Sequence, residues 1–254
     1  MDMDDHKIHN KSKNIKQMRE GKKPITSKLL SFYKRLSPRD VQNDSEFEFA
    51  PVLTSTNVER ASVNKDAVIR YARKHGLPVL FWVDQYGKVP AAVRRRSPKE
   101  LTMMSEKYFV AGAPCMITKN LQPTEITEVV NGSKGTLHSL SWSYRYEVPS
   151  TWKPGEIVEV PVPSHVNVLL DKDTHKNNGG ILPCGMQNGE VNVCGAKLKL
   201  RQHPVTLLFA VTPFKVQGQT TPRLILDLRY KEGKALSNFR FRGSLCCDQS
   251  YKML

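Results

Sequence analysis

The apolar residues of this chain are grouped in short runs, of which the clearest are residues 207–211 (LLFAV) and 224–228 (LILDL). Apolar runs of this length, bounded by polar residues, are typical of buried strands. Between them, residues 215–220 (KVQGQT) carry one cation, two amides, a hydroxyl and a glycine. A buried strand that ends in such a turn is how α/β folds bring polar side chains to the rim of a parallel sheet.

A second strand is predicted at residues 49–55, and it leads directly into residues 56–59 (TNVE), which have the capping-box spacing of a helix start. The helix that follows has apolar residues on one face and ends at Gly76, and residues 78–83 form the next apolar run. Strand, helix and strand in this order form a βαβ unit, which favours a parallel sheet. The predicted fold class is therefore α/β.

The middle of the chain has a different pattern. Asn131-Gly132 is a turn signal, and together with Gly135 it predicts a tight bend after the buried strand at residues 110–120. From residue 138 to residue 202 the sequence consists of short alternating strands broken by proline and glycine. This stretch predicts a small β-barrel inserted into the α/β domain.

The charge balance points to a polyanionic partner. The chain has 254 residues with 39 Lys and Arg against 24 Asp and Glu, a net charge of +15, and nucleic acid is the usual ligand of such a surface. None of the five cysteines forms a C-x-x-C pair, which argues against a zinc site or a disulfide framework. No apolar run approaches the roughly 18 residues of a membrane span, and the N-terminus is polar. We expect an intracellular protein without a membrane partner, with the nucleus as its location.

The turn after residues 207–211 also carries a family resemblance. Thr212-x-x-Lys215-x-Gln217-Gly218-x-Thr220 resembles motif V of superfamily 1 DNA helicases, in the group of RecD and the petite-frequency helicases. Residues 50–57, together with Asn64, resemble the motif IV region of the same family, although Thr56 and Asn57 are also the residue types that a plain helix cap selects. The Asn131-Gly132 turn resembles the point at which that family opens an inserted SH3-like domain. A plain hairpin turn is the alternative there.

The resemblance implies roles for particular residues. The residues implied to contact nucleotide are Lys215, Gln217, Gly218, Thr220 and Arg240. Those implied to contact single-stranded nucleic acid are Thr56, Asn57, Asn131, Gly132, Lys134 and Thr212. It implies no catalytic or metal-binding residue in this chain. For the intact family enzyme it implies ATP and Mg²⁺, neither of which this chain is expected to bind alone.

Several parts of an ATP-hydrolysing motor are missing from the sequence. There is no G-x-x-x-x-G-K-[ST] loop to hold the β- and γ-phosphates, and no Asp-Glu pair follows an apolar strand. The nearest string to the family's arginine motif is residues 236–240 (LSNFR), in which Asn238 stands at the first arginine position. Residues 235–239 align equally well with the stretch before that motif. Arg240 and Arg242 are therefore candidates for an arginine finger and no more.

These patterns predict four segments: a basic disordered tail at 1–28, a RecA-like domain at 29–137 and 203–245, an SH3-like insertion at 138–202, and a divergent tail at 246–254. The predicted function is that of the C-terminal half of a 5′-to-3′ ATP-dependent DNA helicase of the repair, recombination or replication type. As a fragment without its N-terminal RecA-like lobe, it would not hydrolyse ATP. The alternatives are a non-enzymatic nucleic-acid-binding module with Trp142, Tyr144 and Tyr146 as stacking platforms, or a degenerate mobile-element relic.

Overall fold

The computed structural model of the chain describes residues 36–37, 39, 45–54, 56–121, 129–171, 180–193, 195–216 and 223–226. The chain divides into two compact units: unit 1, Met1–Thr56 with Val211–Leu254, and unit 2, Asn57–Ala210. The predicted tails at 1–28 and 246–254 lie outside the described residues.

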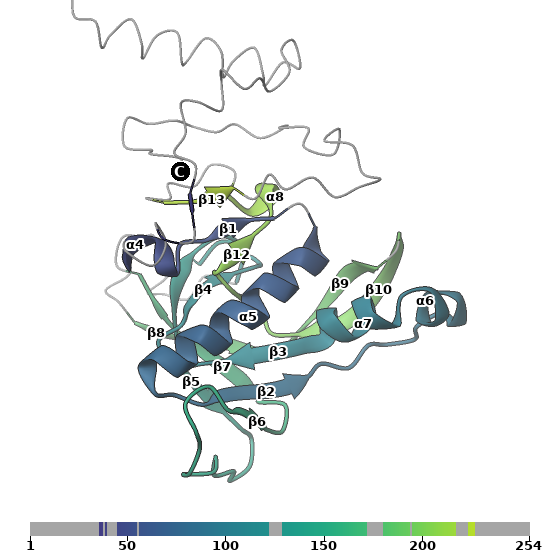
Figure 1. The fold of residues 1–254 in the computed structure, drawn as a ribbon. Helices are drawn as coiled ribbons and strands as arrows, with labels where there is room; N and C mark the ends of the chain where they lie inside the picture. The colour runs from purple at the N-terminus through teal and green to yellow at the C-terminus, as the bar shows by residue number, and fades with distance from the viewer. Residues whose placement is uncertain are drawn as a thin grey trace, which may run out of the picture. The chain divides into compact units, whose positions relative to one another are not determined.

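Unit 1 contains the strands on either side of the predicted nucleotide turn (Figure 1). Its elements are α4 (Ser45–Glu48), β1 (Val52–Leu53), the last residue of β12 (Ala210–Val211), α8 (Pro213–Val216) and β13 (Ile225–Leu226). The strand order is β12-β1-β13, and β1 and β13 run parallel with Val52 opposite Ile225. Phe47 is 2% exposed, and the guanidinium of Arg223 lies 4.6 Å from the centre of its ring.

Unit 2 begins with the long helix α5 (Asn57–His75), which buries Ala67, Val68 and Ala72. The helix ends where the sequence predicts, because Gly76 has a φ of +67°, a left-handed conformation that favours glycine. Helix α5 packs on a sheet with the order β3-β2-β6. The strands are β2 (Val79–Val83), β3 (Glu106–Phe109) and β6 (Ile157–Glu159), and α6 (Ala91–Arg96) and α7 (Pro98–Ser105) connect β2 to β3.

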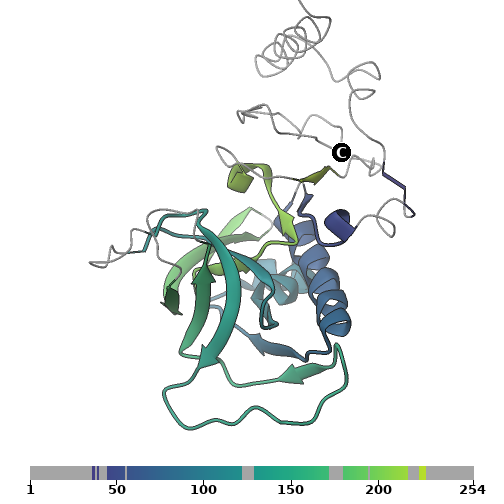
Figure 2. The same cartoon turned by 90° about the vertical axis from the view of Figure 1, so that its left-hand side faces the viewer.

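A five-stranded antiparallel sheet, bent along its strands, forms the second layer of unit 2 (Figure 2). In the order of the sheet, its strands are β11 (Val205–Leu207), β4 (Pro114–Ile117), β5 (Lys134–Ser141), β7 (His165–Leu170) and β8 (Ile181–Gly185). Gly135 of β5 leaves no room for a side chain, since a Cβ there would collide with the backbone of Leu169. Strands β9 (Gln187–Val193) and β10 (Ala196–Gln202) form a separate hairpin, which packs Val193 and Leu198 against Val93 and Leu101.

The predicted α/β class is confirmed as a mixed α/β fold, and parallel pairing occurs at β1–β13 and at β2–β6. Strands β1 and β2, however, belong to different sheets, so they do not form the simple βαβ unit that was predicted. The closed SH3-like barrel is not confirmed, because no sheet of the described residues closes on itself. The five-stranded sheet also recruits β4 and β11 from outside residues 138–202. Local alternation predicts strands, but it does not determine which distant strands pair.

Candidate nucleotide and nucleic-acid site

In unit 1 the ends of β1 and β12 meet. The carbonyl oxygen of Val211 accepts two hydrogen bonds from Thr54, one from its backbone N–H at 2.9 Å and one from its Oγ1 at 3.3 Å. Thr54 is 5% exposed, so this double contact is internal. Thr56 follows Thr54 by two residues and Thr212 follows Val211 directly. The structure therefore brings both of these predicted nucleic-acid contacts to the same end of one sheet.

The turn that follows β12 carries Lys215. Its backbone N–H donates to the carbonyl oxygen of Thr212 at 2.9 Å, which closes the first turn of α8 just beyond the strand. Lys215 is half-buried at this position. The other predicted nucleotide contacts, Gln217, Gly218, Thr220 and Arg240, lie outside the described residues.

Two asparagines on α5 have different surroundings. Asn57, a predicted nucleic-acid contact, is exposed at the first residue of the helix. Asn64 is 6% exposed, and its amide makes a two-way contact with Ala210, donating from Nδ2 to the carbonyl oxygen at 3.3 Å and accepting at Oδ1 from the backbone N–H at 2.9 Å. Asn64 therefore fixes the backbone just before the predicted nucleotide turn, which is a structural role.

The predicted bend at Asn131-Gly132 is confirmed as a turn directly before β5. Gly132 has a φ of +101°, which explains the glycine. Its N–H donates to the carbonyl oxygen of Ile117 at 2.9 Å, and the N–H of Asn131 donates to Oδ1 of Asn120 at 2.8 Å. Lys134 begins β5 and is half-buried, and this burial lowers the pKa of its amine. The turn presents Asn131 at the surface, while the role of these residues in binding stays a prediction.

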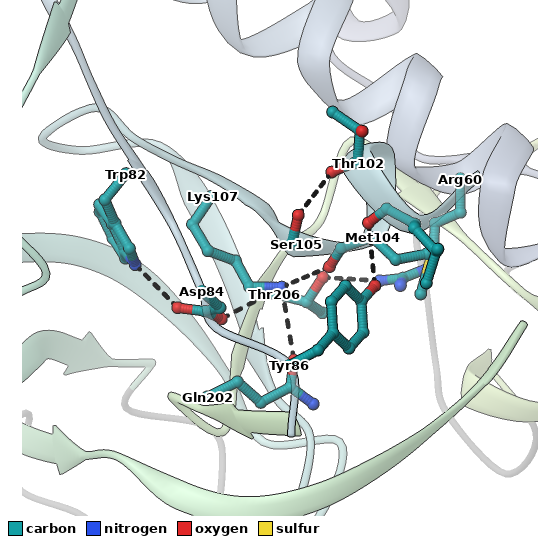
Figure 3. A network of polar contacts seen from close by, with 11 residues as sticks. Arg60, Trp82, Asp84, Tyr86, Thr102, Met104, Ser105, Lys107, Gln202 and Thr206 are labelled. Carbon is teal, nitrogen blue, oxygen red and sulfur yellow. Dashed lines mark hydrogen bonds and ion pairs between the residues drawn. The ribbon is translucent and has the colours of Figure 1, made fainter. Parts of the chain in front are cut away.

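A buried polar network occupies unit 2 beside β2 (Figure 3). Asp84, whose side chain is 0% exposed, accepts a hydrogen bond at Oδ1 from Trp82 Nε1 at 3.1 Å, and its Oδ2 lies 3.5 Å from Lys107 Nζ. Lys107 also donates to the carbonyl oxygen of Met104 at 3.0 Å and to Oε1 of Gln202 at 3.3 Å. Through these three acceptors, Lys107 of β3 is connected to the end of β2, to α7 and to β10.

Burial sets the protonation of this network. It raises the pKa of Asp84 and lowers the pKa of Lys107, and the ion pair between them opposes both shifts. A second cation, Arg60, donates from Nη1 to Oγ1 of Thr206 at 2.7 Å, and burial lowers its pKa as well. These charged groups are held inside unit 2 by specific partners, which is what a low-dielectric interior requires.

His203 is the titratable neighbour of the network. Its ring meets that of Trp82 edge-on at 5.9 Å, and its Nε2 lies 3.1 Å from the carbonyl oxygen of Pro163. Burial lowers the pKa of His203 to about 4, so the imidazole is neutral at pH 7 and Nε2–H donates to Pro163. Sequence reasoning missed this network. The only signal was Asp84 directly after an apolar strand.

The aromatic residues proposed as stacking platforms are not equivalent. The rings of Trp142 and Tyr146 pack on each other at 4.8 Å, and Trp142 Nε1 donates to the carbonyl oxygen of Pro161 at 2.9 Å. Tyr144 is 55% exposed. Of the three, Tyr144 offers the most accessible ring face.

Comparison with known proteins places the fold. No family model matches the sequence, and no curated protein sequence is significantly similar to it. The Pif1 helicase from Candida albicans matches with a TM-score of 0.51 at 16% identity, over 92% of this chain and 50% of that chain. The fold is similar to that of a Pif1 helicase. Unliganded Pif1 from Bacteroides sp matches with a TM-score of 0.46 at 16% identity, over 92% of this chain and 46% of that one.

A structure of two coordinating Pif1 helicases at forked double-stranded DNA matches with a TM-score of 0.49 at 16% identity, covering 87% of this chain and 41% of that one. The chain thus spans half or less of the length of these Pif1 chains. The match to the Candida albicans structure shows a fold similar to that of a Pif1 helicase, while membership of superfamily 1 and a relation to RecD stay predictions.

Two kinds of feature are absent from the described residues. None of their helices is long and apolar enough to cross a membrane. No group of three or more His, Cys, Asp or Glu side chains in the described parts of the chain is arranged to hold a metal ion.

Proposed function

We propose that this chain is the C-terminal motor half of a Pif1-like DNA helicase and that it binds single-stranded nucleic acid. The observation that carries the proposal is the double hydrogen bond from Thr54 to Val211, which brings the ends of β1 and β12 together. This contact puts Thr56 and Thr212 at one end of a sheet and starts the Lys215 turn at the same place. The net charge of +15 supports a polyanionic ligand.

In this proposal each predicted residue has a chemical task. In unit 1 the hydroxyls of Thr56 and Thr212 donate to phosphate oxygens of the strand. In unit 2 the side-chain amides of Asn57 and Asn131 and the ammonium of Lys134 are further donors, and the turn at Gly132 holds Asn131 at the surface. Lys215, Gln217, Gly218 and Thr220 serve both nucleotide and strand, and Arg240 serves the nucleotide.

The remaining parts of the motor come from another lobe. An N-terminal RecA-like lobe would supply the loop that holds the ATP phosphates and the carboxylate that holds Mg²⁺. Closure of the two lobes around ATP would then step the motor along the single strand in the 5′-to-3′ direction. The proposed setting is DNA repair, recombination or replication in the nucleus. Alone, the chain binds nucleic acid and does not hydrolyse ATP.

Binding of a fluorescent single strand of about 20 nucleotides, followed by anisotropy, tests the proposal. We expect tighter binding to the single strand than to a duplex of the same length. We expect Thr212→Val/Lys215→Met to weaken single-strand binding about tenfold, because one phosphate contact and one cation are lost. The matched control is Thr151→Val/Lys99→Met, which removes the same groups from exposed positions elsewhere.

Equal binding of the two DNA forms, or unchanged binding by the Thr212/Lys215 variant, would overturn the proposal. A second assay addresses the motor directly. The purified chain should release no phosphate from ATP above the blank, with or without single-stranded DNA. DNA-stimulated hydrolysis would contradict the claim that another lobe is needed.

A second candidate function rests on Tyr144, whose ring is 55% exposed. In a non-enzymatic nucleic-acid-binding module, this ring would stack on a base. Tyr144→Ala would then weaken single-strand binding, by about 1 to 3 kcal/mol for one stacked base. The helicase proposal predicts little change, since Tyr144 is not among its contacts.

A further inference from the structure

Strand β10 separates its apolar and charged side chains completely. Leu198 and Leu200 are 2% and 1% exposed, whereas Lys197, Lys199 and Arg201 alternate with them and are all exposed. Side chains two residues apart on a strand point to the same face. The three cations, called here the β10 cation row, therefore stand in a line on the outer face of the hairpin.

The opposite strand does not neutralise the row. Across the hairpin, Lys197 faces Asn192, Lys199 faces Glu190 and Arg201 faces Asn188. Glu190 is the only carboxylate among these partners. Neither it nor any cation of the row makes a salt bridge or a side-chain hydrogen bond with another described residue. The row has three positive charges against one negative charge.

A groove of about 790 Å³ runs beside the row within unit 2. Lys199 and Arg201 line it together with Tyr86, Val162 and Met186. Both sides of the groove are fixed in place. The N–H of Gly87 donates to the carbonyl oxygen of Lys199 at 3.0 Å, Tyr86 forms a β-bridge with Leu200, and the Tyr86 hydroxyl donates to the carbonyl oxygen of Leu101 at 2.9 Å.

We propose that the β10 cation row and this groove bind the backbone and bases of one nucleic-acid strand. The row supplies ammonium and guanidinium donors for consecutive phosphates. The groove beside it is lined by a thioether, an aliphatic side chain and the half-buried Tyr86, whose ring also packs against the hairpin core, and bases pack against such side chains whatever their sequence. Asn188 and Glu190, which also line the groove, add polar atoms for base edges.

The groove beside the row favours a single strand. The unstacked bases of a single strand are free to enter a groove while its phosphates follow the row. Duplex bases are stacked and paired inside the helix.

This surface deepens the proposed function by naming a further contact for the same ligand, and it can be tested separately. The row is made of unit 2 residues, and none of them is among the contacts assigned to the Thr212–Lys215 turn. The two sets of variants therefore report on different residues of the full-length chain.

The experiment measures anisotropy of a fluorescent single strand of about 20 nucleotides between about 50 and 200 mM salt. The test variant is Lys197→Gln/Lys199→Gln/Arg201→Gln. The matched control is Arg94→Gln/Arg95→Gln/Arg96→Gln, which removes the same charge from three exposed residues of α6. Urea unfolding of each variant verifies that the fold is retained.

We expect the test variant to bind about tenfold more weakly at the lowest salt. Its plot of log affinity against log salt should be shallower by about 2, because each lost phosphate contact of a single strand removes about 0.7 from the slope. The control should keep the slope of the wild-type chain. A strand carrying 5-iodouracil should photocrosslink to peptides that contain Tyr86 or Met186.

Equal losses in the test and control variants would show that bulk charge explains binding, and would overturn the inference. Crosslinks confined to other peptides would do the same. If the Thr212/Lys215 variant binds normally while the row variant is weakened, the proposed helicase site fails and the β10 surface stands. A wild-type chain that binds no nucleic acid removes both.

Discussion

Unit 2 holds charged side chains in two contrasting settings. Lys107 is half-buried, its side chain 25% exposed, with Asp84, the carbonyl oxygen of Met104 and the amide of Gln202 around its ammonium. Lys199 lies outside on β10, opposite Glu190 but without an ion pair to it. The same residue type is surrounded by acceptors in one place and makes no side-chain hydrogen bond or ion pair with a described residue in the other.

The difference follows from the cost of desolvation. The fully buried carboxylate of Asp84 needs a partner, because an unpaired buried charge is strongly destabilising, and the half-buried ammonium of Lys107 provides it. A solvated ammonium such as that of Lys199 has no such requirement and is available to a ligand. Polar and charged groups inside this fold therefore need partners, whereas exposed rows of cations are candidate phosphate-binding surfaces. Four substitutions test the first half of this comparison.

The largest effect is expected from Asp84→Asn, which leaves Lys107 without its carboxylate. We expect the free energy of unfolding to fall by about 3 kcal/mol, because the half-buried ammonium is then left with neutral acceptors only. Urea unfolding at neutral pH measures the loss. Asp84→Asn/Lys107→Met, which removes both charges, should recover most of it. A single variant as stable as the wild type would show that the pair does not stabilise the fold.

His203 gives a pH-dependent version of the same test. Its pKa of about 4 in the fold lies below the ordinary 6.5, so the unfolded chain binds more protons between these values. Stability from the neutral imidazole is complete above about pH 6.5 and is lost as the pH falls toward 4. Compared with His203→Gln, the wild type should lose about 3 kcal/mol more between pH 7 and pH 4. Parallel pH profiles for the two proteins would refute this role.

Asn64 tests an uncharged buried contact. Asn64→Ala removes both partners of the Ala210 backbone and leaves a buried N–H and a buried carbonyl unsatisfied. We expect a loss of about 2 kcal/mol, measured by urea unfolding. Asn57→Ala on the same helix is the control and should change stability by less than about 0.5 kcal/mol, since Asn57 is exposed. Equal effects at the two positions would contradict the assignment.

The smallest effect is expected at the rim. Lys65 Nζ lies 3.0 Å from Glu106 Oε2, but the Lys65 side chain is 38% exposed. We therefore expect Lys65→Met to lower the free energy of unfolding by no more than about 0.5 kcal/mol, with the difference shrinking in high salt. If Lys65→Met lowered the free energy of unfolding as much as Asp84→Asn, side-chain exposure would not explain the difference between the Lys65–Glu106 and Lys107–Asp84 pairs.

The sequence predicts local elements of this fold well. Gly76 ends α5, Gly132 forms a turn directly before β5, and residues 79–83 form a strand, because each depends on neighbours in the sequence. The pairing of distant strands was predicted less well. Strand β1 is only two residues long, and the alternating pattern of residues 138–202 does not encode that β4 and β11 join the same sheet.

The candidate site was predicted in the same uneven way. Thr56 and Thr212 each come directly after a predicted strand, and these two strands lie side by side in one sheet. The Asp84–Lys107 pair joins the end of β2 to β3, and Gln202 reaches it from β10, so it exists only once the strands are packed. The β10 cation row was readable as an alternation of Lys, Leu and Arg, but its exposure depends on the packing of Leu198 against α6 and α7.

The comparison is tested most directly by one binding assay, in which a variant of the Asp84–Lys107 pair is measured beside a variant of the β10 cation row. Asp84→Asn/Lys107→Met and Lys197→Gln/Lys199→Gln/Arg201→Gln are titrated with the same labelled single strand over the same salt range. The internal variant should bind as the wild type does, and the row variant should show a salt slope shallower by about 2. Equal slopes for the two variants would contradict the account.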